Sequence, residues 1–180
     1  MPSPQSLSEP DRRTVALWAA DCAERVLDLF EAEAPDDDRP RDAIARARAF
    51  GRGELSAAGE IARRFVAGRA ARDVHGAAAV AAARAAAQAA GVAHMGAHAL
   101  GAAGYAALAV GLAHPDQPDA VSAEIEWQVG HASGEVRAAL LTLPPVGENS
   151  SGPLGAGLLS TGELGRIIAR LQTALRASAT

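Results

Sequence analysis

The stretch from Ala85 to His114 carries no Asp, Glu, Lys or Arg, and this run constrains the fold more than any other feature. It is longer than the roughly 18 apolar residues that indicate a membrane-spanning helix. However, it consists largely of alanine and glycine and includes Gln88, His94 and His98, and polar groups inside a bilayer are costly. A helix that is apolar all round is a buried helix. We therefore predict a central segment enclosed by amphipathic helices, away from lipid.

The alanine content predicts an all-α fold. Hydrophobic residues make up 49% of the chain but aromatic residues only 3%, and no segment alternates apolar and polar residues as a strand does. Alanine has the highest intrinsic helix propensity and a low strand preference. We predict a single helical domain over residues 1–180, folded as an irregular bundle of six to eight helices around a central Ala-rich helix or helix pair. Residues 77–113 would span about 55 Å as one helix, so we expect a break near Gly91 and Gly96.

Capping residues indicate where the other helices begin. Ser8 and Pro10 are typical of the start of a first helix, which we expect to continue to residue 34. Asp38 can cap a second helix and Ser133 a short later one. Residues 1–9 are expected to be flexible, and residues 144–159 to form a long loop. The last helix then buries an apolar stripe, made of Leu164, Ile167, Ile168, Leu171 and Leu175.

Charge and cysteine content limit the classes of function. The net charge of −4 argues against nucleic-acid binding, which needs a basic surplus. Cys22 is the only cysteine, and the first residues lack the basic start and apolar core of a signal peptide. We therefore expect a cytoplasmic protein. Lysine is absent, and this arginine bias indicates a bacterial genome of high GC content.

The candidate metal ligands are histidines. His94 and His98 are four residues apart, so on a helix they share one face, and His75 is the candidate third ligand. Such a set could bind zinc or nickel. The pattern lacks the glutamate of the H-E-x-x-H motif, and hydrogen-bonded histidines within the bundle are the favoured interpretation. We predict no metal, no other cofactor and no catalytic residues, because no catalytic motif is present.

Acidic residues around the end of the first predicted helix are candidate partner contacts. Glu31, Asp36, Asp37 and Asp38 could meet a basic protein surface, or they could form a solvated loop. Earlier in the first predicted helix, Asp21 or Glu24 is expected to pair with Arg39 or Arg41 and so fix the angle between the first two helices. The glycine-rich residues 152–157 do not end in Gly-Lys-Ser/Thr, so we interpret them as a connector or a recognition loop.

Three blocks of the chain resemble the Imm-5-like putative immunity protein family of bacterial polymorphic toxin systems. They are residues 17–27 (LWAADCAERVL) with 30–31 (FE), residues 38–44 (DRPRDAI) and residues 93–106 (AHMGAHALGAAGYA), and the resemblance covers about residues 12–115. It implies an all-helical, non-enzymatic protein that binds and blocks a toxin. Two alternatives remain: a metal- or small-molecule-binding bundle that uses His94 and His98, and a structural or oligomerisation module with closely packed Ala/Gly helix faces.

Overall fold

The computed structural model describes residues 3–63 and 66–178 of the chain. Within these ranges the chain is helical and has no strand, which confirms the all-α prediction. The helices are α1 (Glu9–Glu24), α2 (Leu27–Glu31), α3 (Arg39–Gly51), α4 (Ala57–Arg63), α5 (Val66–Ala70), α6 (Ala77–Gly91), α7 (His98–Ala113), α8 (Ala120–His131), α9 (Gly134–Leu141) and α10 (Gly162–Ala177), with a 3-10 turn at Leu158–Ser160.

The described residues form ten α-helices, more than the six to eight expected. One reason is that the first predicted helix is interrupted, because α1 ends at Glu24 and α2 begins at Leu27. At the interruption the Val26 N–H donates to the Ala23 carbonyl, as in a tightened final turn of a helix. The additional helices are short, since α2 and α5 have five residues each.

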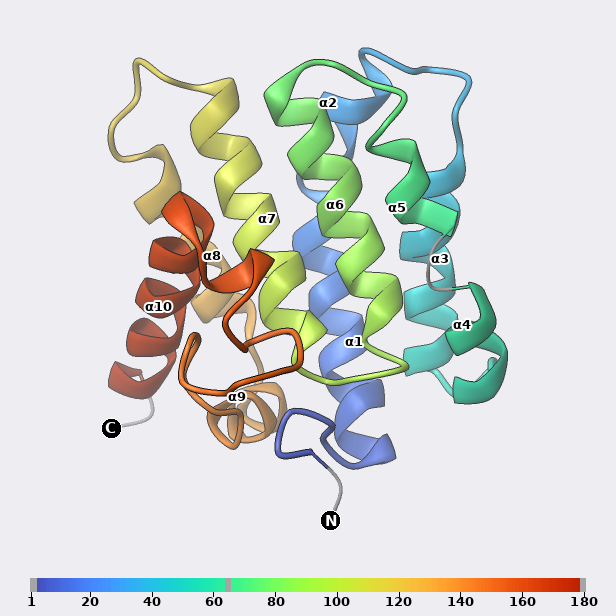
Figure 1. Cartoon of the computed structure of the whole chain (residues 1–180), viewed down its shortest axis with the longest axis vertical. Coiled ribbons are helices and arrows are strands. Elements are labelled where there is room, and N and C mark those ends of the chain that lie inside the picture. Colours follow the sequence, from blue (N-terminus) through green and yellow to red (C-terminus); the bar gives the residue numbers. More distant parts are fainter. Residues whose placement is uncertain (1–2, 64–65, 179–180) are drawn as a thin grey trace.

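The Ala-rich segment forms the antiparallel pair α6–α7 at the centre of the molecule, with α1 behind it (Figure 1). The predicted break is confirmed, since α6 ends at Gly91 and α7 begins at His98. Ten of the sixteen residues of α7 are buried, so the charge-free stretch is enclosed as predicted. None of the described helices has the length and apolar character needed to cross a membrane.

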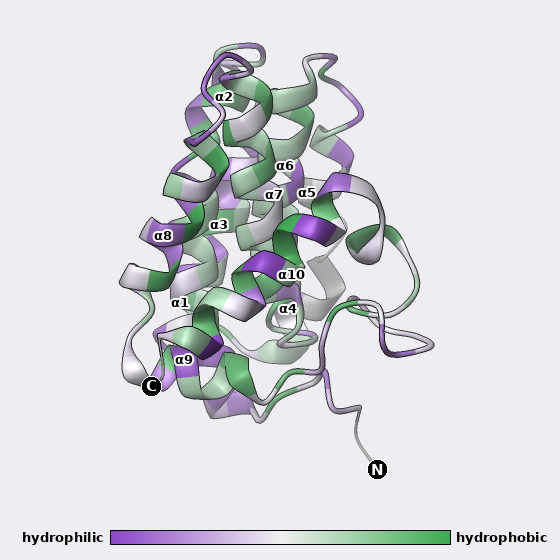
Figure 2. Ribbon diagram, turned by 90° about the vertical axis from the view of Figure 1, so that its left-hand side faces the viewer, coloured by the Kyte–Doolittle hydropathy of each residue, from purple (hydrophilic) through white to green (hydrophobic). Residues whose placement is uncertain are grey.

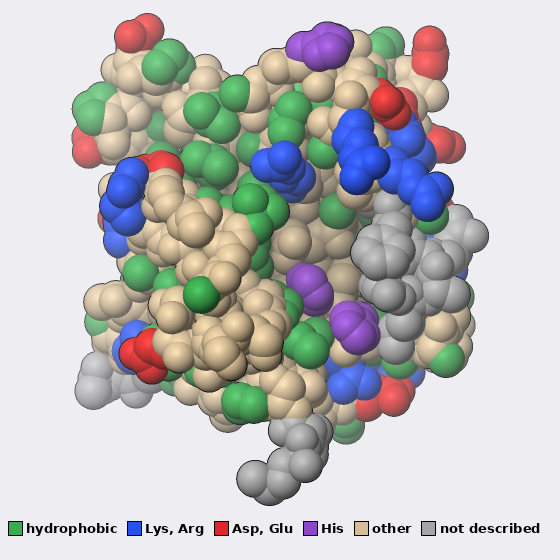
Figure 3. Space-filling view, viewed as in Figure 1, with side chains coloured by type: hydrophobic (Ala, Val, Ile, Leu, Met, Phe, Trp, Pro, Cys, Tyr) green, Lys and Arg blue, Asp and Glu red, His purple; other side chains and the backbone are tan. Residues whose placement is uncertain are grey.

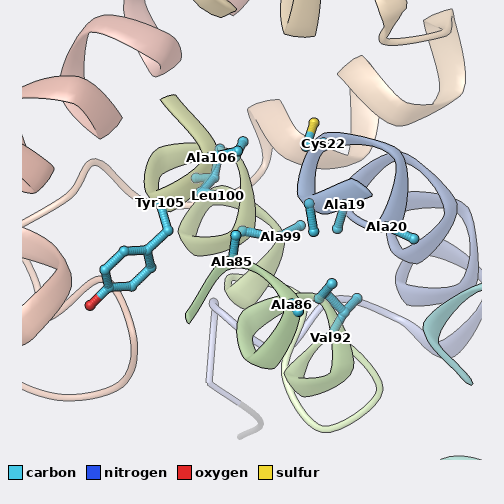
Figure 4. Close-up of a cluster of buried hydrophobic side chains, with 14 of the residues drawn as sticks. Ala19, Ala20, Cys22, Ala85, Ala86, Val92, Ala99, Leu100, Tyr105 and Ala106 are labelled. Carbon is cyan, nitrogen blue, oxygen red and sulfur yellow. The ribbon is translucent and has the colours of Figure 1, made fainter. Parts of the chain in front are cut away.

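Small side chains bring the three central helices close together. Ala19 of α1 lies near Ala99 of α7, which lies beside Ala85 of α6, while Tyr105 points away from them towards the C-terminal segment (Figure 4). Colouring by hydropathy shows polar residues concentrated on the outer sides of the surrounding helices (Figure 2). The outer helices therefore supply the polar surface that the central pair lacks.

The remaining helices close the bundle around α7. Helix α10 packs against α7 and α8, and its apolar stripe is buried as predicted. Ser133 caps α9 by accepting a hydrogen bond from the Val136 N–H, and Ser8 caps α1 in the same way through the Asp11 N–H. The first and last described residues lie at the same end of the molecule (Figure 1).

Candidate binding surface

A groove runs along α1 between α3 on one side and α8 and α9 on the other; we call it the α1 groove. Thr14, Leu17, Asp21 and Glu24 recur at spacings of three and four, so they share one face of α1 and form the floor. The groove consists of two adjoining hollows of about 290 and 350 Å³, and Asp21 and His131 line both of them. The first is lined by Arg13, Thr14, Leu17, Trp18, Asp21, Gly51, His131, Ser133, Glu135 and Val136, and the second by Asp21, Glu24, Arg25, Trp127 and His131.

Two carboxylates on the groove floor share one arginine. The Arg48 guanidinium of α3 lies 2.6 Å from Asp21 Oδ1 and 2.6 Å from Glu24 Oε2. Its hydrogen bond holds the pKa of Glu24 below the usual range of a glutamate. The second oxygen of Asp21 lies 3.0 Å from His131 Nε2, which donates to it. Asp21 thus connects α1 to both walls of the groove.

The second wall is built from stacked side chains. The Arg25 guanidinium lies 3.8 Å from the centre of the Trp127 ring, and the His131 ring stacks on Trp127 with 4.6 Å between the ring centres. Arg25 also binds Glu124 at 2.9 Å, and the Glu124 side chain is only 3% exposed. The amide of buried Gln128 donates to Glu124 and to the Ala103 carbonyl of α7. This arrangement fixes the rotamers that face the groove.

The acidic residues of α1 do not pair with the arginines predicted from the sequence. Asp21 and Glu24 bind Arg48, whereas Arg39 binds Asp37 and Asp73, and Arg41 binds Glu31. The reason is that α1 and α3 run antiparallel (Figure 1), and the end of α3 at Phe50 and Gly51 lies beside Arg13 and Leu17. Arg48, less than one turn earlier on α3, therefore reaches the last turn of α1. The ion pairs still join α1 to α3, but nearer the end of α3.

The acidic cluster predicted to contact a partner is largely engaged within the chain. Glu31 binds Arg41, and Asp37 binds Arg39, which lowers the pKa of Asp37. The neighbouring Glu33 accepts the N–H groups of His75 and Gly76 at the start of α6, and these bonds lower its pKa. Asp36 and Asp38 are exposed, and Asp38 caps α3 without a side-chain hydrogen bond. Partner binding by this cluster stays a prediction.

The structure brings two of the three candidate metal-binding histidines together. The rings of His94 and His98 lie 6.4 Å apart, and His98 Nδ1 contacts Gln88 Oε1 at 2.8 Å. Burial, and then the neighbouring His94, lower the pKa of His98 to about 4. His75 precedes α6 while His94 follows it, which separates them by roughly 22 Å of helix.

No group of three or more His, Cys, Asp or Glu side chains that could hold a metal ion occurs within the described ranges. On the face shown in Figure 3, histidines appear at two well-separated places, in agreement with this distribution. Cys22 is fully buried on the apolar face of α1, and burial raises the pKa of its thiol well above the ordinary value. An uncharged, enclosed thiol is a poor nucleophile.

The groove could hardly be predicted from the sequence, because its residues come from distant segments. Arg25 and Glu124 are 99 residues apart in the chain, and Arg48 and Asp21 are 27 apart. The spacing of Thr14, Leu17, Asp21 and Glu24 was the one available signal, since it puts three polar side chains and Leu17 on a single face of a largely buried helix.

These observations define an all-α bundle whose recessed surface carries charged and aromatic side chains on a rigid helical frame. The chain belongs to the Imm-5 like putative immunity protein family, whose model matches residues 5–135. The matched range extends from the N-terminal segment through α8 and ends at the beginning of α9. A search of curated proteins and a search of solved structures found no match.

Proposed function

We propose that this protein is a non-enzymatic immunity protein that binds a bacterial protein toxin and blocks it in the cytoplasm. The observation that carries the proposal is the family match, which extends over residues 5–135. The rigid, polar α1 groove lies almost wholly within that range and is compatible with a stoichiometric binding role. Such a role needs a pre-organised surface and no catalytic group.

The proposal can be tested with the protein encoded beside this gene. That neighbouring protein is expressed in a heterologous bacterium with and without this chain, and growth and complex formation are measured. We expect toxicity from the neighbour alone, rescue on co-expression, and co-elution of the two purified proteins as a stable complex. A harmless neighbour, or a toxic one that neither binds nor is neutralised, would refute the proposal.

The ratio of this protein to the toxin that is needed for protection distinguishes binding from enzymatic inactivation. A blocking protein must match its toxin molecule for molecule, whereas an enzyme that modifies the toxin protects at much lower amounts. We expect protection to end near an equimolar ratio. The control is Leu100→Asp, which places a charge in the fully buried centre of α7 and should abolish rescue by unfolding the bundle.

A further inference from the structure

Resting on the proposed immunity function, we infer that the α1 groove is the docking surface for a basic segment of the toxin. The groove floor extends from Arg13 to Glu24, which is about 17 Å along the helix. That length accommodates roughly five extended residues or three turns of helix. The occupant is therefore a short segment of a protein that carries arginine or lysine side chains.

The charge of the groove favours a cationic occupant. Each arginine in its lining already has a carboxylate partner, since Arg13 binds Glu9 and Arg25 binds Glu124. Asp21 and Glu24 share the single guanidinium of Arg48. Glu135 adds a further exposed carboxylate that has no ion pair among the described residues. Negative charge is therefore in surplus.

The two central carboxylates are accessible to a partner. The side chains of Asp21 and Glu24 are 34% and 52% exposed, although both are oriented by Arg48. A guanidinium or ammonium group entering from solvent can thus form charge-assisted hydrogen bonds without rearranging the site. Pre-oriented side chains also lose less entropy when the partner binds.

The other half of the groove offers an apolar contact. Leu17 is 37% exposed, which makes it one of few large apolar side chains at the surface, and Trp18 and Val136 line the same hollow. An apolar centre beside charged groups is the usual composition of a protein-binding surface. A segment that alternates basic and apolar residues would satisfy both halves.

The family match favours this groove over the other large hollow. All residues of its lining except Val136 fall within the matched range. The hollow between α8 and α10 is lined by Ala169, Arg170, Thr173, Ala174 and Ala177 on one side, and these residues lie outside the match. A surface used by the whole family is expected to lie within the segment that the family shares.

The inference is tested by measuring the affinity of this chain for the toxic protein encoded beside its gene, using calorimetry. Glu24→Gln removes one groove charge and should weaken binding about tenfold, a change of about 1.4 kcal/mol. Its matched control is Glu163→Gln on α10. Glu163 is 51% exposed and also binds an arginine, so its loss tests the same chemistry at a distant place.

A second pair of variants blocks the groove by size and charge. Thr14→Arg puts a cation on the groove floor and should weaken binding at least about a hundredfold. Its control is Thr173→Arg on α10, because both hydroxyls donate to the carbonyl four residues earlier on their helices. Thermal melts check that all four variants remain folded.

The outcomes separate the two proposals. Weaker binding by Glu24→Gln and Thr14→Arg, with unchanged binding by both controls, supports the groove. Tight binding by every variant overturns the groove while the immunity function stands. If the unaltered chain does not bind the neighbouring protein, the immunity function fails, and the groove inference fails with it.

Discussion

Glu124 is a buried carboxylate that forms an ion pair with Arg25. Its side chain is 3% exposed, and its carboxylate is bound by Arg25 and by the Gln128 amide. Removal of one partner of a buried ion pair leaves an uncompensated charge, which is far more destabilising than the loss of an exposed pair. The stability of the α1–α8 contact should therefore depend on Arg25.

We predict that Arg25→Ala lowers the free energy of unfolding by about 2–4 kcal/mol, measured by equilibrium urea denaturation. The matched control is Arg41→Ala, which breaks the pair with Glu31. The Arg41 side chain is 63% exposed, so its loss should change stability by less than about 1 kcal/mol. Replacing Arg25 and Glu124 together by leucine should restore part of the loss. Equal effects of the two single alanine variants would contradict this account.

The low pKa of His98 predicts a stability that decreases in mild acid. Burial keeps the folded pKa at about 4, whereas an unfolded histidine titrates near its model value of 6.5. Between these values the unfolded chain binds a proton that the folded chain does not, so the free energy of unfolding falls as the pH is lowered from 6.5 to 4. The slope from this group is at most about 1.4 kcal/mol per pH unit.

His98→Asn tests this assignment, because the asparagine amide can still donate to Gln88 but does not titrate. Urea denaturation across this pH range should give a shallower pH dependence for His98→Asn than for the unaltered chain. His114→Asn, at an exposed histidine, is the matched control for the loss of a histidine elsewhere in the chain. An unaltered slope in His98→Asn would mean that other groups cause the acid sensitivity.

At the scale of the elements, the contact between α7 and α10 depends on Gly104. A Cβ atom at this position would lie 2.6 Å from Ile168 Cγ1, inside the fully buried stripe of α10. We predict that Gly104→Ala is destabilising by about 1–3 kcal/mol, because overpacking outweighs the gain in helix propensity. Gly130→Ala on α8 meets nothing within 4 Å and should stabilise by up to about 1 kcal/mol. Urea denaturation distinguishes the two, and stabilisation by both would show that α10 shifts freely.

Local sequence signals predicted the helix ends and the core with success. The Ser8 and Ser133 caps, the break after Gly91 and the apolar stripe of α10 all correspond to short-range patterns, and each is present in the structure. Such features depend on residues within a turn or two of one another. Burial of α7 was equally predictable, because the helix carries no Asp, Glu, Lys or Arg.

Features set by tertiary packing were not predictable. The chain turns between α1 and α2 at Arg25 and Val26, where no proline or glycine marks a break. The partner of Asp21 was predicted as Arg39 or Arg41, but the crossing of α1 and α3 selects Arg48. The α1 groove depends in the same way on how α8 and α9 lie against α1, which no local pattern specifies.

At the scale of the whole molecule, two buried glutamines fasten the long loop before α10. Gln5 accepts the Leu154 N–H and donates to the Ser151 carbonyl, while the backbone next to it binds the α6–α7 turn. Gln172 of α10 accepts the Val146 N–H and donates to the Pro144 carbonyl. Residues 3–9 belong to the segment expected to be flexible, yet Gln5 is 1% exposed. The loop is thus held at both ends by side chains from opposite ends of the chain.

The effects of the two glutamines should be measurable separately, because each side chain accepts a hydrogen bond from a different backbone N–H of the loop. In native-state hydrogen exchange we predict that Gln5→Ala accelerates exchange of the Leu154 amide by about tenfold or more, while the Val146 amide stays protected. We predict that Gln172→Ala accelerates exchange of the Val146 amide instead, while the Leu154 amide stays protected. The Ala97 amide, bound by the Gln5 carbonyl, should remain protected in Gln5→Ala because the backbone contact is kept. Each change also leaves buried polar groups unpaired, so stability should fall by about 1–3 kcal/mol. Simultaneous loss of protection at Leu154 and Val146 in either variant would mean that the loop opens as one cooperative unit.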